Sequence, residues 1–293
     1  MPFLKSKPGG FYYPPNYPTR MVWLVKIKFK LRSLYRWFRV LKFTTMAMGY
    51  QYSSSNDLIE IDITYECNLR CMNCNRSSAQ APEKKHISVE QIQMFVSESI
   101  EKKRFWRRIR VLGGEPTLHP DFHKIIDELS KLQQHGLANV IQLVTNGFGP
   151  KVTKALASLP ANIEVENSSK TNNIQPTFGP FNLAPCDDAK YRYSNFKNGC
   201  DIMHNCGLGL TPQGYYPCSV AGGIDRVTKA GIGRQHLPEL NDDMRDLLER
   251  NCKLCGRFRD GHYVPEKLRP KLLNQLTSPS WLTIYQTWKR SNG

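Results

Sequence analysis

Between residues 57 and 175 the hydrophobic positions follow two alternating periods, which predict a succession of strands and helices. Short alternating or unbroken apolar runs predict four strands, at Glu60–Thr64, Arg108–Leu112, Val140–Val144 and Ile163–Glu166. Apolar residues spaced three and four apart predict three helices, at Val89–Lys103, Asp121–His135 and Lys151–Leu159. Repeated strand–helix units predict an α/β fold, built as a partial (β/α) barrel or a strongly curved parallel sheet.

The flanking segments have different patterns, which predict three regions along the chain. Residues 1–56 form a basic extension, residues 57–180 the α/β core, and residues 181–293 a small cysteine-rich lobe that ends in a helix over Asn274–Lys289. Within the extension, residues 21–43 predict an amphipathic helix. One face of this helix carries Ile27, Leu31, Leu34, Phe38 and Leu41, and another carries Lys28, Arg32, Arg36, Arg39 and Lys42.

The seven cations of residues 21–43 exclude a membrane-spanning helix. Three interpretations remain. The helix lies on the surface of an anionic membrane, or it packs on this protein's own core or on a partner, or it belongs to a mitochondrial presequence.

The net charge of +16 is concentrated at one end of the chain. Ten of the 41 cations and none of the 25 anions lie in residues 1–50, so the rest of the chain carries about +6. A nucleic-acid-binding domain needs a basic stripe on its folded part, so we do not expect nucleic acid as a partner. The content of 40% hydrophobic and 23% charged residues is ordinary for a folded domain.

Nine cysteines carry the main chemical signal. Their odd number, their tight clusters and the lack of an apolar export signal before them predict reduced, metal-binding thiols and a cytoplasmic protein, either free or peripheral to the cytoplasmic membrane. Cys67, Cys71 and Cys74 follow the first strand with the spacing C-x3-C-x2-C. Three thiolates on one loop can hold three irons of a 4Fe–4S cluster and leave the fourth iron open. Zinc usually takes four ligands, so it fits this spacing less well.

Further polar groups follow the next three strands, at the edge where parallel sheets bind ligands. They are Gly113, Gly114 and Glu115 after the second strand, Asn146 after the third, and Asn167, Ser168 and Ser169 after the fourth. The two glycines allow the backbone to approach a ligand closely. The asparagines and serines have a second interpretation, as turn and helix-cap residues.

The cysteine loop, followed by Gly113-Gly114-Glu115-Pro116, resembles the radical S-adenosylmethionine (radical SAM) superfamily over roughly residues 57 to 175. The resemblance implies that the open iron chelates the methionine part of S-adenosylmethionine, whose reductive cleavage gives a hydrogen-abstracting 5'-deoxyadenosyl radical. It also implies that Glu115 contacts the methionine ammonium, and that Asn146 and residues 167–169 hold the ribose and the carboxylate. Asn73 departs from the family, which often has an aromatic residue there, so no adenine contact is assigned.

Five later cysteines, Cys200, Cys206, Cys218, Cys252 and Cys255, resemble the Twitch and SPASM extensions of the superfamily. The resemblance implies one auxiliary 4Fe–4S cluster, held by Cys218, Cys252, Cys255 and either Cys200 or Cys206. A zinc staple on Cys206, Cys218, Cys252 and Cys255 is the alternative. Cys186 stands apart and has two interpretations, as a small buried residue or as a hydrogen-atom donor to a substrate radical, a role that the spare thiol of Cys200 or Cys206 could also fill. Arg192 is a candidate substrate ligand.

Overall size and the single auxiliary lobe resemble the superfamily's dehydrogenases and epimerases of sugars and cyclitols. We therefore expect hydrogen abstraction that leads to oxidation or epimerisation of a sugar-like or cyclitol-like small molecule. A maturase that modifies a peptide is the alternative, followed by a non-enzymatic, metal-stapled protein that docks on membranes. An enzyme of this type also needs an electron donor such as a flavodoxin or ferredoxin.

Overall fold

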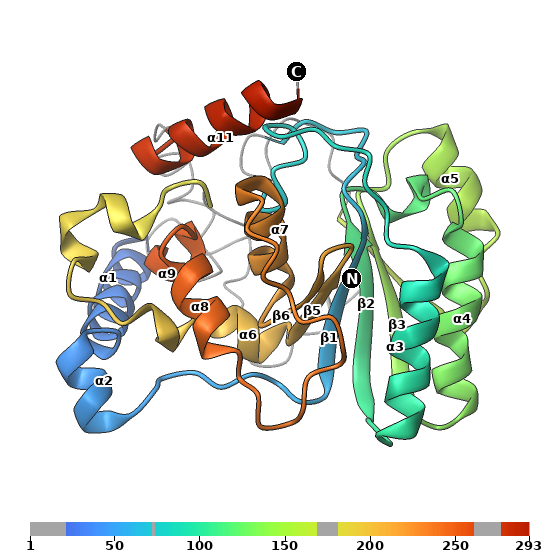
Figure 1. The fold of residues 1–293 in the computed structure, drawn as a ribbon, viewed down its shortest axis with the longest axis horizontal. Helices are drawn as coiled ribbons and strands as arrows, with labels where there is room; N and C mark the ends of the chain where they lie inside the picture. Colours follow the sequence, from blue (N-terminus) through green and yellow to red (C-terminus); the bar gives the residue numbers. More distant parts are fainter. Residues whose placement is uncertain (1–21, 72–73, 169–180, 261–276, 293) are drawn as a thin grey trace.

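The computed structural model describes residues 22–71, 74–168, 181–260 and 277–292, and its centre is a six-stranded sheet (Figure 1). The strands are β1 Leu58–Thr64, β2 Trp106–Gly113, β3 Ala138–Thr145, β4 Ile163–Asn167, β5 Leu208–Thr211 and β6 Gly214–Tyr216. Their order is β4-β3-β2-β1-β5-β6. Neighbouring strands are parallel except for β5 and β6, which are antiparallel. The predicted α/β fold with a parallel sheet is confirmed.

Three helices cover one face of the sheet: α3 Val89–Glu101, α4 Phe122–Gln134 and α5 Pro150–Ala157 (Figure 1). They correspond to the three predicted helices. Every second residue of β1 points towards them, so that Ile59, Ile61 and Ile63 are buried in the main hydrophobic cluster with Phe95 of α3 and Leu129 of α4. Burial of each such side chain contributes roughly 1.5–3 kcal/mol, which fixes the sheet on which the candidate site is built.

The opposite face of the sheet is polar, and we call it the inner face. It carries Glu60, Asp62 and Arg110, and helix α7 Ser219–Thr228 covers it (Figure 1). Four more helices lie on the α7 side of the sheet: α6 Asp201–Asn205, α8 Arg245–Cys252, α9 Gly256–Asp260 and α11 Pro279–Asn292. Short 3-10 helices occupy Pro116–Leu118, Pro185–Asp187, Ala189–Tyr191 and Phe196–Asn198.

Strands β5 and β6 come from beyond the predicted boundary at residue 180, yet they belong to the same sheet as β1. Ile59 of β1 pairs with Leu208 of β5, and Ile61 pairs with Leu210. The cysteine-bearing part of the chain is therefore built directly onto the sheet. The predicted C-terminal helix is α11, and residues 274–276 of the prediction lie outside the described residues.

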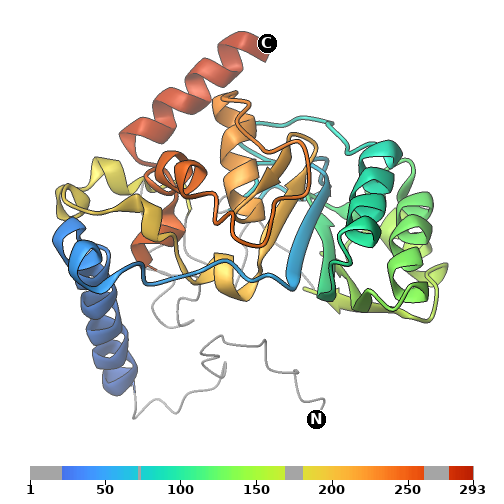
Figure 2. The ribbon, with the colours of Figure 1, turned by 60° about the horizontal axis from the view of Figure 1, so that its bottom comes forward.

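Helices α1 Val22–Arg39 and α2 Lys42–Met48 lie at the end of the molecule opposite α3, α4 and α5 (Figures 1 and 2). The helix predicted for residues 21–43 is observed only in part, because α1 ends at Arg39, Leu41 is buried outside it and Lys42 begins α2. Helix α1 faces the protein with the side that carries Arg36 and Arg39. Arg36 and Arg39 are buried, whereas Leu31 and Leu34 are 61% and 56% exposed. Within the described part of the chain, no helix combines the length and apolar character needed to cross a membrane.

Candidate active site

The loop after β1 carries the three cysteines of the first predicted cluster. The amide of Cys74 donates to the carbonyl of Cys71 at 3.2 Å, and the Cys67 Sγ accepts from the Leu69 amide at 3.4 Å. Burial raises the pKa of Cys67 to about 11; the Leu69 amide opposes this rise, and Cys74 and Cys71 add to it. The three thiols therefore lie near enough to act on one another, and residues 72–73 of the loop are outside the described part.

The glycines after β2 hold the cysteine loop through close backbone contact. A Cβ on Gly113 would lie 2.2 Å from the Thr64 carbonyl oxygen, and one on Gly114 would lie 2.1 Å from that of Glu66. The Gly114 amide donates to the Thr64 carbonyl at 2.7 Å, and the Glu115 amide to the Glu66 carbonyl at 2.8 Å. The chain thus needs glycine here for its own packing, while close approach of a ligand stays a prediction.

The Glu115 carboxylate lies fully buried between the ends of β2 and β3. Its Oε1 accepts from the Thr117 hydroxyl at 2.7 Å and from the Thr145 hydroxyl at 2.8 Å, and its Oε2 accepts from the Asn146 amide at 2.8 Å. A buried carboxylate with this many donors acts as a brace between the two strands. Contact between Glu115 and a methionine ammonium stays a prediction.

Asn146 links β3 to the cysteine loop. Its Nδ2 donates to the Asn68 Oδ1 at 2.8 Å and lies 3.9 Å from the Cys67 Sγ. Ser168 bonds to the Thr145 carbonyl through its amide and its hydroxyl, at 2.9 and 2.8 Å. Asn167 ends β4 opposite Thr145, and Ser169 lies outside the described residues. The structure thus places Asn146 beside the predicted cluster ligand and uses Ser168 to secure the end of β4.

A buried network of charges at the inner face was missed by the sequence analysis. Arg76 bonds to both carboxylate oxygens of Asp62, with distances of 3.0–3.2 Å, and its Nη2 donates to the Ser219 hydroxyl at 2.6 Å. Arg110 pairs with Glu60 at 2.5 Å and with Glu166 at 2.9 Å. The signal was present in the strands, because Glu60, Asp62 and Arg110 occupy alternate positions on one face.

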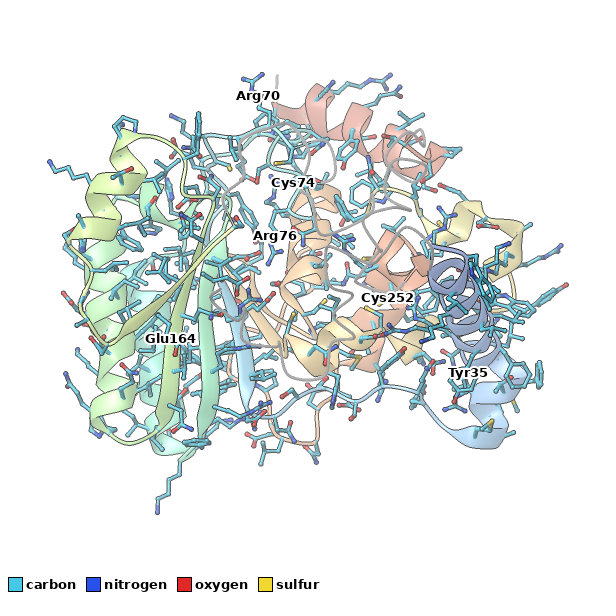
Figure 3. All side chains as sticks on the ribbon, turned by 180° about the vertical axis from the view of Figure 1, so that it is seen from behind. Tyr35, Arg70, Cys74, Arg76, Glu164 and Cys252 are labelled. Carbon is cyan, nitrogen blue, oxygen red and sulfur yellow. The ribbon has the colours of Figure 1, made fainter. Side chains whose placement is uncertain are left out.

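This network lies between the cysteine loop and α7. Figure 3 shows Arg76 between the sheet and α7, with Cys74 on one side of it and Cys252 on the other. Burial raises the pKa of Asp62 to about 6; Arg76 opposes the rise and Glu60 adds to it. Burial also opposes the charge of Glu60, but Arg110 and Arg76 lower the pKa of Glu60 to about 2. The inner face therefore holds two carboxyl groups with different proton affinities.

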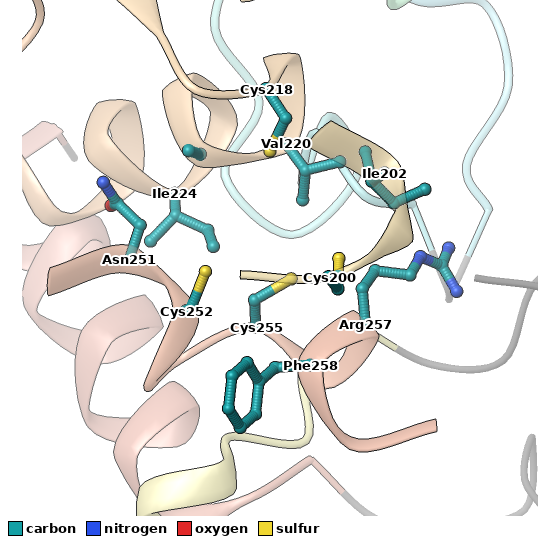
Figure 4. A pocket seen from close by; sticks show the side chains of 11 residues that line it. Cys200, Ile202, Cys218, Val220, Ile224, Asn251, Cys252, Cys255, Arg257 and Phe258 are labelled. Atoms are coloured by element: carbon teal, nitrogen blue, oxygen red, sulfur yellow. The ribbon is translucent and has the colours of Figure 1, made fainter. Parts of the chain in front are cut away.

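Four of the five later cysteines line one pocket on the α7 side of the sheet. They are Cys200, Cys218, Cys252 and Cys255, and Figure 4 shows their sulfur atoms pointing into a common space. Apolar side chains of Val220, Ile224 and Phe258 surround them. Burial raises the pKa of Cys200 to about 12, and it raises the pKa of the other three thiols as well. All four thiols are thus close together in a low-dielectric environment.

The remaining candidates lie elsewhere. Cys206 does not line the pocket; it instead lies close enough to Glu60 and Arg110 to lower the pKa of the first and raise the pKa of the second. Cys186 is exposed, with its sulfur 3.6 Å from the Ser280 hydroxyl, rather than buried as the simpler interpretation predicted. Arg192 is also exposed and packs over the Tyr193 ring at 5.7 Å.

Both sets of cysteines fit iron–sulfur clusters by the chemistry of their donors. Among the described residues, no three His, Cys, Asp or Glu side chains converge on a point that would hold a single metal ion. A cubane cluster takes one thiolate per iron, so its ligands surround a larger volume than a single ion needs. Cys200, Cys218, Cys252 and Cys255 supply four thiols around one pocket, and the β1 loop supplies three.

Comparison with known proteins identifies the class. Residues 61–210, half of the chain, match the model of the Radical SAM superfamily. The chain therefore belongs to the radical SAM superfamily and is an enzyme of that family. Membership implies a 4Fe–4S cluster and S-adenosylmethionine as cofactors.

Several curated proteins are similar to parts of the chain. Human molybdenum cofactor biosynthesis protein 1 is 33% identical over 124 residues, which are 39% of this chain and 18% of that protein. The probable GTP 3',8-cyclase of Methanococcus vannielii is 37% identical over 88 residues, 30% of this chain and 28% of that protein. Mycofactocin maturase MftC of Mycobacterium ulcerans is 31% identical over 232 residues, 75% of this chain and 53% of that protein. The chain thus spans at most about half the length of these relatives.

Among solved structures, BtrN in complex with AdoMet and 2-DOIA covers 70% of this chain and 94% of its own, with a TM-score of 0.42 and 14% sequence identity.

Proposed function

We propose that the chain is a two-cluster radical SAM oxidoreductase that dehydrogenates a polar substrate at the inner face. The observation that carries this proposal is the pocket lined by Cys200, Cys218, Cys252 and Cys255. Four protein ligands leave no iron open, so a cluster held there suits electron transfer rather than substrate binding. An electron acceptor is what a dehydrogenase of this class needs once a hydrogen atom has been removed.

Different groups of residues serve the successive steps of the proposed reaction. When bound, the cofactors at Cys67, Cys71 and Cys74 supply the radical that takes a hydrogen atom from a substrate carbon. The substrate must then lose a proton and an electron to complete a two-electron oxidation. The four later cysteines would hold the electron acceptor.

The inner face supports a small, hydroxylated substrate. Gln142 of β3 is only partly buried and lies beside Arg110 at 3.1 Å, and its amide is a partner of the kind that sugar or cyclitol hydroxyls require. A peptide is the alternative substrate. The similarity to the mycofactocin maturase, which extends over 75% of this chain, supports that alternative.

Epimerisation is a second candidate reaction, favoured by Cys206. Its thiol lies at the inner face beside Glu60 and Arg110, where it could return a hydrogen atom to a substrate radical. The exposed Cys186 has no comparable position. A reaction in D2O separates the candidates, because a thiol exchanges its hydrogen with solvent. Epimerisation leaves a deuterium in the product and fails in Cys206→Ala, whereas dehydrogenation leaves none and survives.

Anaerobic reconstitution tests the core of the proposal. We expect about eight iron atoms per chain from two cubane clusters, and about four in the Cys67→Ala, Cys71→Ala, Cys74→Ala variant. Reduced protein should release 5'-deoxyadenosine from S-adenosylmethionine, and the triple variant should not. Cys200→Ala and Cys206→Ala form a matched pair: the first should disrupt the auxiliary cluster and the second should not. Unchanged release of 5'-deoxyadenosine by the triple variant would contradict the proposal. Zinc bound in the pocket of Cys200, Cys218, Cys252 and Cys255 would contradict its auxiliary-cluster part.

We also propose that α1 binds an anionic membrane surface. Trp23, Ile27, Leu31, Leu34 and Phe38 are 42–61% exposed and share one side of the helix. Exposed Lys28 and Lys30 fall on opposite edges of this apolar side, where their ammonium groups can reach lipid phosphates. Residues 1–50 contain no acid to repel the lipid. We favour lipid over a protein partner because a helix that lies flat on a membrane meets anionic headgroups along both edges of its apolar side, where these lysines are.

Vesicle flotation tests the membrane proposal with point variants, because a truncated chain would lose Arg36 as well. The protein should float with vesicles of phosphatidylglycerol and phosphatidylcholine and remain unbound to phosphatidylcholine alone. Leu31→Glu with Leu34→Glu should abolish flotation, while Phe105→Glu, at an exposed apolar position elsewhere, should not. Lys28→Gln with Lys30→Gln should weaken binding by about 1 kcal/mol for each lysine. No flotation of the unaltered protein, or equal binding by the leucine variant, would refute the proposal.

A further inference from the structure

Arg36 of α1 is a buried cation beside the four-cysteine pocket. Only 5% of the residue is exposed. Its Nη2 donates to the Arg257 carbonyl at 3.3 Å, and its guanidinium carbon lies 5.7 Å from the centre of the Phe258 ring. Arg257 and Phe258 both line the pocket. The N-terminal helix therefore brings a positive charge from outside the cysteine-rich segment to the back of this site.

The charge of Arg36 is incompletely compensated. Among the described residues, its Nε and Nη1 are buried and have no hydrogen-bond partner. Asp201 acts on it electrostatically, but that carboxylate already pairs with Arg32 at 2.8 Å. A buried cation without a full set of partners is costly, so an anion in the adjoining space would stabilise the folded protein.

Cys200, Cys218, Cys252 and Cys255 line the same pocket as Arg257 and Phe258, the two residues that Arg36 contacts. Deprotonated thiolates around iron would supply the missing negative charge. Arg36 and the pocket would thus be electrostatically complementary when the cysteines carry a metal group.

We propose that Arg36 is a counter-charge of the auxiliary cluster, in addition to Arg257 in the pocket lining, and that it raises the reduction potential of the cluster. The inference rests on the proposed function, because it needs an iron–sulfur cluster on Cys200, Cys218, Cys252 and Cys255. One-electron reduction adds one negative charge to a thiolate-ligated cluster and breaks no bond. A fixed cation nearby stabilises the reduced form more than the oxidised form, so it raises the potential. Helix α1 then forms part of the redox site as well as part of the protein surface.

The placement of α1 is suited to this role because its inner side is anchored at several points. Arg32 pairs with Asp201, the residue after Cys200. The indole nitrogen of Trp37 donates to the Lys190 carbonyl at 2.9 Å. Val40 packs in one hydrophobic cluster with Cys252 and Phe258. These contacts hold Arg36 in position relative to the pocket.

A potentiometric titration followed by electron paramagnetic resonance tests the inference. The background is the full chain with Cys67→Ala, Cys71→Ala and Cys74→Ala, so that only the auxiliary cluster contributes. Arg36→Gln should shift the midpoint potential to a more negative value, while Arg36→Lys, which keeps the charge, should stay near the parent. Arg39→Gln is the matched control, because Arg39 is a buried arginine of the same helix. It should leave the potential unchanged.

Iron and sulfide analysis distinguishes a missing auxiliary cluster from a cluster that Arg36 does not influence. A background protein with no iron, or with zinc, overturns the auxiliary cluster itself. If the cluster is present and its potential is the same in the parent and in Arg36→Gln, only the role of Arg36 is overturned. A shift in Arg36→Lys or Arg39→Gln as large as that in Arg36→Gln has the same meaning. If Arg36→Gln does not fold, Arg36→His replaces it. Histidine gains a positive charge as the pH falls from about 9 to about 6, so the potential of the auxiliary cluster in this variant should rise over that range. A potential without added pH dependence then overturns the inference.

Discussion

The guanidinium of Arg76 bonds to both carboxylate oxygens of Asp62, at 3.0–3.2 Å, in a place that water does not reach. Because Arg76 follows Cys74 by two residues, this contact ties the cysteine loop to the middle of β1. Arg76→Ala would leave buried Asp62 without its partner, so we expect a loss of about 3–5 kcal/mol of unfolding free energy. The measurement is urea unfolding of the anaerobically purified protein.

The control for this variant is Arg107→Ala. Arg107 pairs with Asp57 at 2.8 Å, but both side chains are more than 40% exposed, so its loss should cost about 1 kcal/mol or less. Similar losses for the two variants would show that the buried pair contributes no more than a surface pair.

The pH dependence of stability should report the state of Asp62. Its pKa is raised from 3.8 to about 6, so the folded protein binds this proton more tightly than the unfolded chain does. The resulting stabilisation is complete below pH 3.8 and is lost as the pH rises through about 6. Unfolding at a series of pH values should show the unaltered protein losing stability relative to Asp62→Asn over this window. A difference between the two proteins that does not vary with pH would rule out the raised pKa.

Gly114→Ala tests the backbone contact that holds the cysteine loop. Its new Cβ would lie 2.1 Å from the Glu66 carbonyl oxygen, so either β2 or the loop must shift. We expect a loss of about 1–3 kcal/mol and weaker binding of S-adenosylmethionine, measured by urea unfolding and by calorimetry. Gly231→Ala is the control for strain alone, because Gly231 has a φ of +62° and no atom within 4 Å of the added Cβ. Normal binding of S-adenosylmethionine by Gly114→Ala would show that the contact does not position the loop.

Glu115→Gln should weaken the brace between β2 and β3. In either orientation of the glutamine amide, its NH2 group would face a backbone N–H that cannot accept a hydrogen bond, that of Asn146 or that of Thr117. About 1.5–3 kcal/mol of unfolding free energy should therefore be lost. Glu249→Gln, at an exposed surface pair, should change it by less than about 0.5 kcal/mol. An equal effect of the two substitutions in urea unfolding would argue against the brace.

The sequence allowed the prediction of the features that depend on local patterns. Strands β1 to β4 and the cysteine loop at the end of β1 follow from periodicity and spacing, and they occur close to the predicted positions, whereas β5 was not predicted. Pairing between distant residues could not be predicted in this way. Arg76 reaches Ser219, which lies 143 positions away, and nothing in either local sequence identifies the other.

Two further features depended on packing rather than on pattern. The helical wheel placed leucines and arginines of α1 on different sides, but the side with Arg36 is buried because Asp201 and the Arg257 carbonyl offer partners to Arg32 and Arg36. Cys200 and Cys206 were equivalent candidates by spacing. The five residues of α6 between them direct Cys200 to the pocket and Cys206 to the inner face, so only the fold separates them.

The position of β1 in the sheet has a consequence for synthesis of the protein on the ribosome. β1 lies in the middle of the sheet, but its partner β5 follows it by about 150 residues along the chain. Until residue 211 has left the ribosome, β1 therefore exposes one unpaired edge, the kind of edge that promotes association between nascent chains. Cys218, Cys252 and Cys255 emerge only after β5 and β6, so the iron of the later pocket can be inserted only after all six strands of the sheet have been synthesised.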